Sequence, residues 1–143
     1  MPARSSARTV WEGDLASGSG RTTPDSGAFS TVDVSWDSRT SRAAGMTSPE
    51  ELLAAAHASC FCMALSLELA QAGTPPERLE ATASVEFQPG EGVKSSHIVV
   101  RGRVRGIEQD AFSQAAEAAG EGCPVSGALK GNIEITVEAT LES

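Results

Sequence analysis

The chain has 143 residues, a length typical of a single domain with a substantial hydrophobic core. Its formal net charge of −8 argues against nucleic-acid binding, which needs a positively charged face. Only four Phe, two Trp and no Tyr are present, so the core must consist of small and aliphatic side chains, and oligomerisation would add to it.

The chain shows no signal peptide, lipidation site or membrane-spanning run, and the spacing of its three cysteines does not indicate a disulfide framework. We therefore expect the protein to lie in the reducing cytosol, where thiols are structural, metal-binding or redox-active. Residues 1–8 are predicted to be a polar tail. No repeat or internal boundary divides the rest, so residues 1–143 are expected to form one domain.

The first part of the chain is predicted to form a small group of strands, at residues 9–14, 21–26 and 28–36. Residues 17–21 supply a turn, and Pro24, Asp25 and Gly27 mark another. Residues 37–47 lack periodicity and are predicted to form a loop.

A long helix is predicted between Ser48 and Gly73. Ser48 can cap it, Pro49 suits the first helical position, and Glu51 completes a Ser-x-x-Glu capping box. Gly73 and the prolines after it end the helix. Residues 52–67 contain no charge, so the helix is apolar on all sides and must be surrounded. It is too short and too interrupted to span a bilayer, so we expect it at the centre of a soluble protein.

The second half of the chain alternates between strands and short helices. Alternating apolar side chains predict strands at residues 81–88, 97–105 and 133–142. The first two form a hairpin with a longish loop. Helices are predicted at residues 110–119 and 123–130, the second starting at Pro124. This order predicts an α+β fold, mostly antiparallel, with the long helix against a sheet.

Two cysteines could take part in redox chemistry. Cys123 precedes Pro124 at a helix start, where free amides and the helix dipole favour a thiolate, although a small apolar residue ending a loop explains it as well. Cys60 lies in the middle of the long helix, where burial would raise the pKa of its thiol. It is an inert core thiol unless a cation reaches it, and Arg39 and Arg42 are the nearest candidates in sequence.

His57 lies one helical turn before Cys60, so a Cys–His nucleophilic pair is an option. No third group that would orient the ring is evident, and a hydrogen-bonded core histidine is therefore preferred. The cysteines together with His97 could suggest a metal site, but there is no Cys-x-x-Cys motif. Cys60 and Cys62 are two positions apart on a helix and point to different faces, so Cys62 is expected to serve only in packing.

Glu50 lies about 15 Å along the helix axis from Cys60 and cannot reach the sulfur of its own helix. It could reach the sulfur of a second copy whose helix packs antiparallel across a twofold axis. Glu50 and Glu51 could also simply complement the helix dipole.

Three motifs point to one known family. The segments TSPEELLAAAHASCFCMALS, GCPVSGAL and VWEGD resemble the OsmC/Ohr peroxidases, the osmotically inducible protein C and organic hydroperoxide resistance proteins, on the OsmC branch. The match covers nearly the whole chain in order and spacing. The resemblance implies an intertwined OsmC-like homodimer with antiparallel sheets around two long central helices. It also implies thiol-dependent reduction of organic hydroperoxides at the subunit interface, without metal, flavin or haem.

By position, the resemblance implies that Cys60 is the peroxidatic cysteine and Cys123 the resolving one. Glu50 matches the glutamate that holds the catalytic arginine, for which Arg39 fits best while Arg42 remains the alternative. The histidine at position 57 matches no catalytic role. Position 62 departs from the family pattern, because relatives often carry serine or threonine there.

The implied cycle runs through a sulfenic acid on Cys60, a disulfide with Cys123, and recovery by an external dithiol of lipoyl or another small type. An apolar lining from Leu53 and Phe61 would favour alkyl or lipid hydroperoxides over hydrogen peroxide. Two other functions stay open. One is a redox sensor that forms the same disulfide without catalysis, and the other is a carrier of a small apolar ligand beside an inert Cys60.

Overall fold

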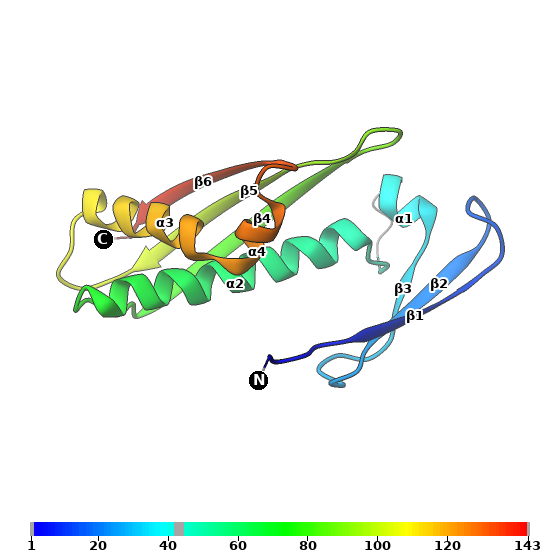
Figure 1. Ribbon diagram of the computed structural model, residues 1–143, viewed down its shortest axis with the longest axis horizontal. Helices are drawn as coiled ribbons and strands as arrows, with labels where there is room; N and C mark the ends of the chain where they lie inside the picture. Colours follow the sequence, from blue (N-terminus) through cyan, green and yellow to red (C-terminus); the bar gives the residue numbers. More distant parts are fainter. Residues whose placement is uncertain (1, 42–44, 143) are drawn as a thin grey trace. The chain divides into compact units, whose positions relative to one another are not determined.

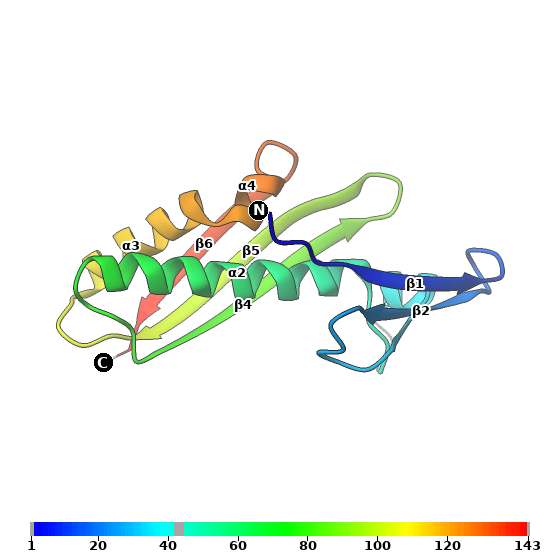
Figure 2. The same cartoon turned by 60° about the horizontal axis from the view of Figure 1, so that its bottom comes forward.

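The computed structural model describes residues 2–41 and 45–142, and Figures 1 and 2 show it from two directions. Its elements run in the order β1 (Ala7–Glu12), β2 (Ser19–Pro24), β3 (Val32–Val34), α1 (Trp36–Ser41), α2 (Pro49–Gln71), β4 (Arg78–Gln88), β5 (Gly92–Arg103), α3 (Gln109–Gly122), α4 (Pro124–Leu129) and β6 (Glu134–Leu141). The chain forms two compact units, residues 1–52 and 53–143. The predicted α+β class and element order are confirmed, with α1 added.

The N-terminal unit contains a three-stranded antiparallel sheet in the order β1-β2-β3. Strand β1 includes Ala7 and Arg8, which the sequence placed in the polar tail, because they pair with Pro24 and Thr23 of β2. Strand β3 is shorter than predicted, since only its residues opposite β2 are paired.

Helix α1 lies where the sequence predicted a loop. The Ser38 N–H donates to Ser35 Oγ and the Ser35 N–H donates to Ser38 Oγ, both at 2.9 Å. This reciprocal pair is a capping box, and it is the one sequence signal that could have revealed a helix too short to show an apolar period. Ser38 Oγ also donates to the Thr47 carbonyl oxygen at 2.8 Å, which ties α1 to the chain just before α2.

Helix α2 begins as predicted, because the Glu51 N–H donates to Ser48 Oγ at 3.0 Å. The other half of the predicted capping box does not form, since the Glu51 carboxylate instead accepts a hydrogen bond from the Thr47 hydroxyl at 2.7 Å. The helix stops two residues before Gly73, whose φ of 85° is the left-handed conformation that commonly follows a helix end.

Helix α2 is apolar on all sides, but a single chain covers only one of them. Within its most apolar stretch, 22% is buried, and Met63 and Leu67 are 73% and 56% exposed. The predicted complete burial is therefore not reached within one chain. By length and composition α2 would also suffice to cross a membrane, so the prediction that it is too short was wrong.

The C-terminal unit is a sheet of order β4-β5-β6 with α2 and α3 packed against it (Figures 1 and 2). Strands β4 and β5 form the predicted antiparallel hairpin, but β5 begins at Gly92, so the loop is short. Strand β6 pairs parallel with β5, and the sheet is mixed rather than antiparallel. The reason is that α3 and α4 form a crossover, which lets the chain re-enter the sheet in the same direction.

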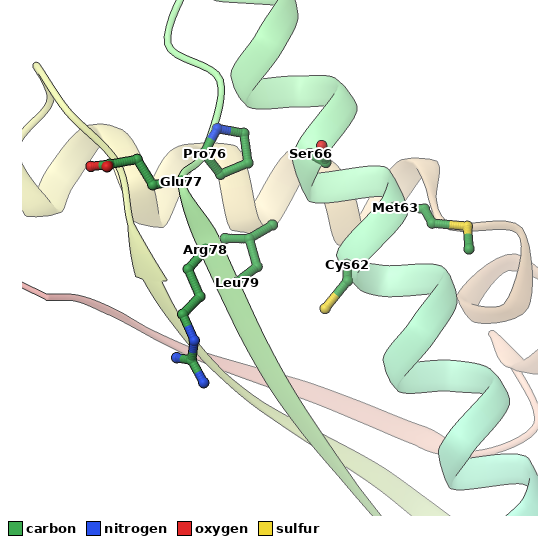
Figure 3. Close-up of a pocket in the computed structure, with 7 residues that line it drawn as sticks. All are labelled: Cys62, Met63, Ser66, Pro76, Glu77, Arg78 and Leu79. Carbon is green, nitrogen blue, oxygen red and sulfur yellow. The ribbon is translucent and has the colours of Figure 1, made fainter.

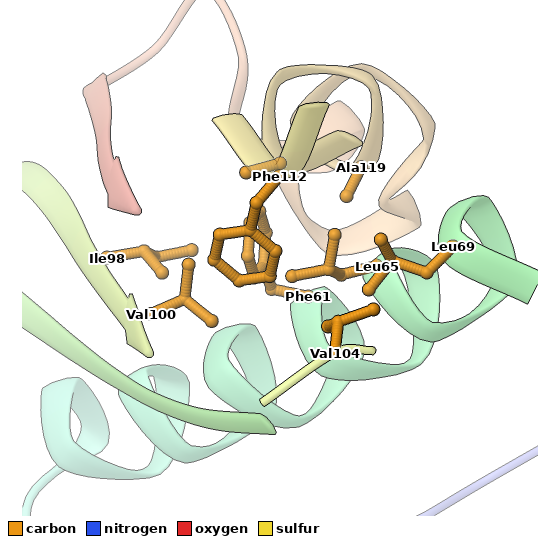
Figure 4. Close-up of a cluster of buried hydrophobic side chains, with 9 residues drawn as sticks. Phe61, Leu65, Leu69, Ile98, Val100, Val104, Phe112 and Ala119 are labelled. Carbon is orange, nitrogen blue, oxygen red and sulfur yellow. The ribbon is translucent and has the colours of Figure 1, made fainter. Parts of the chain in front are cut away.

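The core of this unit lies between α2, β5 and α3 (Figure 4). Its buried members are Phe61, Leu65, Leu69, Ile98, Val100, Val104, Phe112, Ala116 and Ala119. The three from α2 are spaced four residues apart and form one stripe. Burying each large side chain stabilises the fold by roughly 1.5–3 kcal/mol. Because Phe61 is anchored in this core, the position of the adjacent Cys60 relative to the sheet and α3 is fixed.

We expect Gly102→Ala to lower the free energy of unfolding by about 1–3 kcal/mol, because a Cβ on β5 would lie 2.5 Å from the Phe112 ring and 3.1 Å from Leu79. Gly120→Ala is the matched control. It lies within α3 with no described atom near the added carbon, and it should raise stability by about 0.5–1 kcal/mol. Chemical denaturation measures both, and equal stability of Gly102→Ala and the wild type would contradict this packing.

Candidate active site

Cys60 and Cys123 face one another within the C-terminal unit. Their Sγ atoms are 3.1 Å apart, hydrogen-bonded and not covalently joined. Cys60 is half-buried on α2, whereas Cys123 is 1% exposed between α3 and α4. The fold thus brings together two of the thiols that the sequence singled out, which are 63 positions apart in the chain.

Cys123 occupies a sharp junction, since it ends α3 and precedes Pro124 at the start of α4. Burial alone would raise the pKa of its thiol. Hydrogen bonds from the Ser126 amide and hydroxyl, from Cys60 and from the Val125 amide outweigh burial and leave that pKa below its usual value. This agrees with the local argument from sequence, in which amides at a helix start favour a thiolate.

Cys60 has the opposite environment. Burial is the main reason why the pKa of its thiol lies above the usual value, and the neighbouring Cys123 adds to the increase, while a hydrogen bond from the Val125 amide opposes it. Within a single chain the pKa of Cys123 is therefore lowered and that of Cys60 is raised.

Arg39 and Glu50 form an ion pair within the N-terminal unit. Arg39 Nε donates to Glu50 Oε1 at 3.0 Å, and Arg39 Nη2 donates to Oε2 at 2.9 Å. The Glu50 side chain is 8% exposed and that of Arg39 is 31% exposed. The two parallel hydrogen bonds fix the plane of the guanidinium, which also lies over the Trp36 ring at 6.0 Å from its centroid. Arg42, the alternative, lies outside the described residues.

The ring of His57 is fully buried and hydrogen-bonded at both nitrogens. Nδ1 lies 2.6 Å from Ser96 Oγ on β5, and Nε2 lies 2.7 Å from Ser126 Oγ on α4. The preferred interpretation, a hydrogen-bonded core histidine, is confirmed. Burial lowers the pKa of His57, so the ring is neutral at neutral pH. No sequence signal could have identified its partners, because strand register and the crossover bring them together.

Cys62 points from α2 toward β4 and lines a shallow pocket of about 430 Å³ (Figure 3). Burial raises the pKa of its thiol, although a backbone hydrogen bond from Ala81 opposes the increase. The sequence predicted that Phe61 lines a substrate pocket. The structure differs, because the ring of Phe61 is wholly enclosed in the core. Leu53 is partly buried near the start of the C-terminal unit.

His97 is also apart from the thiol pair, since it hydrogen-bonds to Thr136 and Glu138 of β6. Within residues 2–41 and 45–142, no group of three or more His, Cys, Asp or Glu side chains is arranged to hold a metal ion.

The sequence as a whole matches named proteins. The family model described as OsmC-like protein matches residues 42–138. The chain is 38% identical over 136 residues to Peroxiredoxin OsmC of Escherichia coli (strain K12), which covers 93% of both chains. It is 33% identical over 94 residues to Organic hydroperoxide resistance protein OhrA of Bacillus subtilis (strain 168), covering 64% of this chain and 66% of that one.

The fold is shared with solved structures. The crystal structure of an organic hydroperoxide resistance protein OsmC from Legionella pneumophila matches with a TM-score of 0.71 and 23% identity, over 97% of this chain and 99% of that chain. The resemblance indicated by the sequence motifs is thereby confirmed. The chain belongs to the OsmC-like protein family.

Proposed function

We propose that this protein is a cysteine-based peroxidase that reduces organic hydroperoxides to alcohols. Its family and its relatives named peroxiredoxin and organic hydroperoxide resistance protein support this class of activity. The observation that supports the mechanism most strongly is the 3.1 Å separation of Cys60 and Cys123, because a sulfenic acid formed on one sulfur is within reach of the other.

The working form in this proposal is an intertwined homodimer. The uncovered face of α2, with Met63 and Leu67 exposed, is the kind of apolar surface that a partner covers. A second α2 packed antiparallel supplies that cover, and the two compact units then belong to one functional domain of residues 1–143. Function in the reducing cytosol, where free thiols persist, is part of this proposal.

A cation is needed to make Cys60 the attacking thiol, because within one chain burial raises the pKa of its thiol. The Arg39 guanidinium of a second copy, oriented by Glu50, is proposed to lie beside Cys60 at the interface. At an effective dielectric constant of 20, one charge about 4 Å away stabilises a thiolate by about 4 kcal/mol. That corresponds to a decrease of roughly three units in the pKa of Cys60, of which the Glu50 carboxylate offsets a part.

In the proposed cycle, the Cys60 thiolate attacks the distal peroxide oxygen. The O–O bond breaks, the alcohol leaves after taking a proton, and Cys60 becomes a sulfenic acid. The Cys123 thiolate then attacks the sulfenic sulfur, the S–O bond breaks, and hydroxide leaves as water. An external small dithiol, such as a lipoyl group, reduces the disulfide by exchange.

A peroxidase assay with cumene hydroperoxide and excess dihydrolipoamide tests this function. Repeated turnovers per protein are expected, and they would exclude both a stoichiometric redox sensor and a carrier with an inert Cys60. Absence of turnover with every small dithiol tried would contradict the proposal. A parallel assay with hydrogen peroxide tests the preference for organic substrates, and equal rates would contradict that preference.

Cys123→Ser is expected to consume about one equivalent of hydroperoxide and then to stall, because the sulfenic acid has no resolving thiol. Hydroperoxide consumption under excess dihydrolipoamide measures the stall. Cys62→Ser is the matched control and should keep wild-type turnover, since Cys62 lines a different pocket. Full turnover by Cys123→Ser would show that Cys123 does not resolve the sulfenic acid.

A further inference from the structure

A buried chain of hydrogen bonds leads from the sheet to the thiol pair. Ser96 and His57 are fully buried, Ser126 is 4% exposed, and the ring of His57 joins the two hydroxyls at 2.6 and 2.7 Å. Ser126 lies one helical turn after Cys123, in the first turn of α4, and its hydroxyl is one of the groups that lower the pKa of the Cys123 thiol. The proposed peroxidase cycle assigns no role to this chain, although it ends on one of the reacting sulfurs.

The hydrogen atoms of this chain have two self-consistent arrangements, since a neutral imidazole has one donor and one acceptor nitrogen. In the first, Nδ1 accepts from Ser96 and Nε2–H donates to Ser126, so the one proton of the Ser126 hydroxyl points at the Cys123 sulfur. In the second, the Ser126 proton points at Nε2, and the Cys123 thiol donates to Ser126. The first arrangement stabilises a thiolate and the second a thiol.

We propose that the Ser96–His57–Ser126 chain is a positioning relay, in which His57 holds the Ser126 hydroxyl as a donor to Cys123 and thereby sets the rate at which Cys123 closes the disulfide with oxidised Cys60. His57 is a positioning residue, because it acts on the sulfur through Ser126. This role rests on the proposed peroxidase function and deepens it.

The step that the relay accelerates is balanced within the protein. The Cys123 thiolate donates an electron pair to the sulfenic sulfur of Cys60, one S–S bond forms and one S–O bond breaks. The departing hydroxide takes up the proton that Cys123 lost, so one thiol and one sulfenic acid give one disulfide and one water. The thiol is oxidised and the sulfenic sulfur is reduced.

Few charged groups face these residues. Helix α2 presents Cys60 and His57 to Cys123, and β5 presents Ser96, while His97 next to it pairs with Thr136 and Glu138. On the side of α3 and α4, Glu121 and Lys130 form an exposed ion pair with each other. Within one chain, the acidity of Cys123 is therefore set mainly by its burial and by the hydrogen bonds that reach its sulfur, and the Arg39 proposed beside Cys60 is unchanged in all the variants compared below.

The pKa of Cys123 tests the relay directly. In a Cys60→Ser, Cys62→Ser background, the ultraviolet absorbance of the thiolate reports Cys123 alone. Ser126→Ala should raise that pKa by about one unit, since a hydrogen bond to a thiolate is lost. Ser126→Thr keeps the hydroxyl and should restore the value. His57→Met should act like Ser126→Ala, and His57→Gln, which keeps a donor near the Nε2 position, should restore it. An unchanged pKa in Ser126→Ala would overturn the relay.

Disulfide closure in single-turnover experiments gives a second readout, with all three cysteines restored. Ser126→Ala should slow closure roughly three- to tenfold at neutral pH, because a smaller fraction of Cys123 is ionised. The higher nucleophilicity of the more basic thiolate compensates for only part of that loss. The deficit should vanish at alkaline pH. A loss of equal size at every pH would indicate a packing defect and overturn the relay.

The two proposals fail separately, because the titration needs no hydroperoxide. A raised pKa without any hydroperoxide consumption would leave the effect on Cys123 acidity standing and contradict the peroxidase. Hydroperoxide consumption with an unchanged Cys123 pKa would support the peroxidase and contradict the relay.

Discussion

Cys60→Ser should abolish hydroperoxide consumption. The serine hydroxyl is close in size to the thiol and keeps the packing of α2, but it does not ionise near neutral pH and forms no sulfenic acid. The expected residual rate is that of free dithiol with hydroperoxide. The measurement is hydroperoxide loss under excess dihydrolipoamide, with Cys62→Ser as the control two positions away.

Activity retained by Cys60→Ser would reassign the attacking thiol. In the single chain the pKa of Cys123 is lowered while that of Cys60 is raised, so the opposite order of roles is a definite alternative. In that case Cys123→Ser would be the variant without any oxidation event. The two substitutions together therefore identify the peroxidatic cysteine.

Arg39→Ala should lower kcat/KM for organic hydroperoxide by roughly 100- to 1000-fold, the usual effect of removing one preorganised group that stabilises charge in the transition state. The pH at which the Cys60 thiolate forms should rise in the same variant. Arg39→Lys should recover only part of the rate, because an ammonium cannot reproduce the two parallel hydrogen bonds to Glu50. Steady-state kinetics over a range of pH measures both effects.

Two controls separate this role from general damage. Arg21→Ala removes another arginine of the N-terminal unit, which pairs with exposed Glu12, and should leave kcat/KM unchanged. Arg42→Ala tests the other candidate cation. If Arg42→Ala alone causes the large loss, the assignment of Arg39 is wrong.

Mixing two inactive variants tests whether Arg39 acts across the dimer interface. In a mixed dimer of Cys60→Ser and Arg39→Ala chains, one site combines an intact cysteine with an intact arginine from the other chain. Random reassembly should then restore about a quarter of wild-type activity. No recovery after verified subunit exchange would show that both residues act within one chain.

The sequence predicted most of the fold because the strongest local signals agreed with the final structure. The Ser48 cap, the uncharged run that follows and Gly73 defined α2. Alternation of apolar side chains defined β4 and β6 to within a few residues. These features depend on near neighbours in the chain, which is why they could be read without the fold.

Features that depend on distant contacts were missed. The parallel pairing of β6 results from the crossover through α3 and α4, and a strand's own alternation does not encode its direction. Helix α1 is held by a hydrogen bond from Ser38 to Thr47, nine positions away. The exposure of Met63 and Leu67 was also unexpected, because an apolar helix surface does not reveal whether its own chain or a partner covers it.

The residues of the candidate site also fall into two groups, those indicated by local motifs and those brought together only by distant contacts. The motifs around Cys60 and Cys123 indicated which thiols to pair, and the structure brings them to 3.1 Å. Arg39 hydrogen-bonds to Glu50 in the structure, whereas the alternative, Arg42, lies outside the described residues, so the choice between them stays a prediction. The two serines that bind His57 could not be predicted, since they come from β5 and α4 and meet the ring only after the crossover is formed.

The most direct measurement of the central claim is the mass and bonding of the reduced protein after one equivalent of organic hydroperoxide. The account predicts one equivalent of alcohol, a loss of two hydrogens per chain, and a Cys60–Cys123 linkage within one chain in the peptide map. If the protein mass is unchanged and the hydroperoxide is not consumed, the account is contradicted.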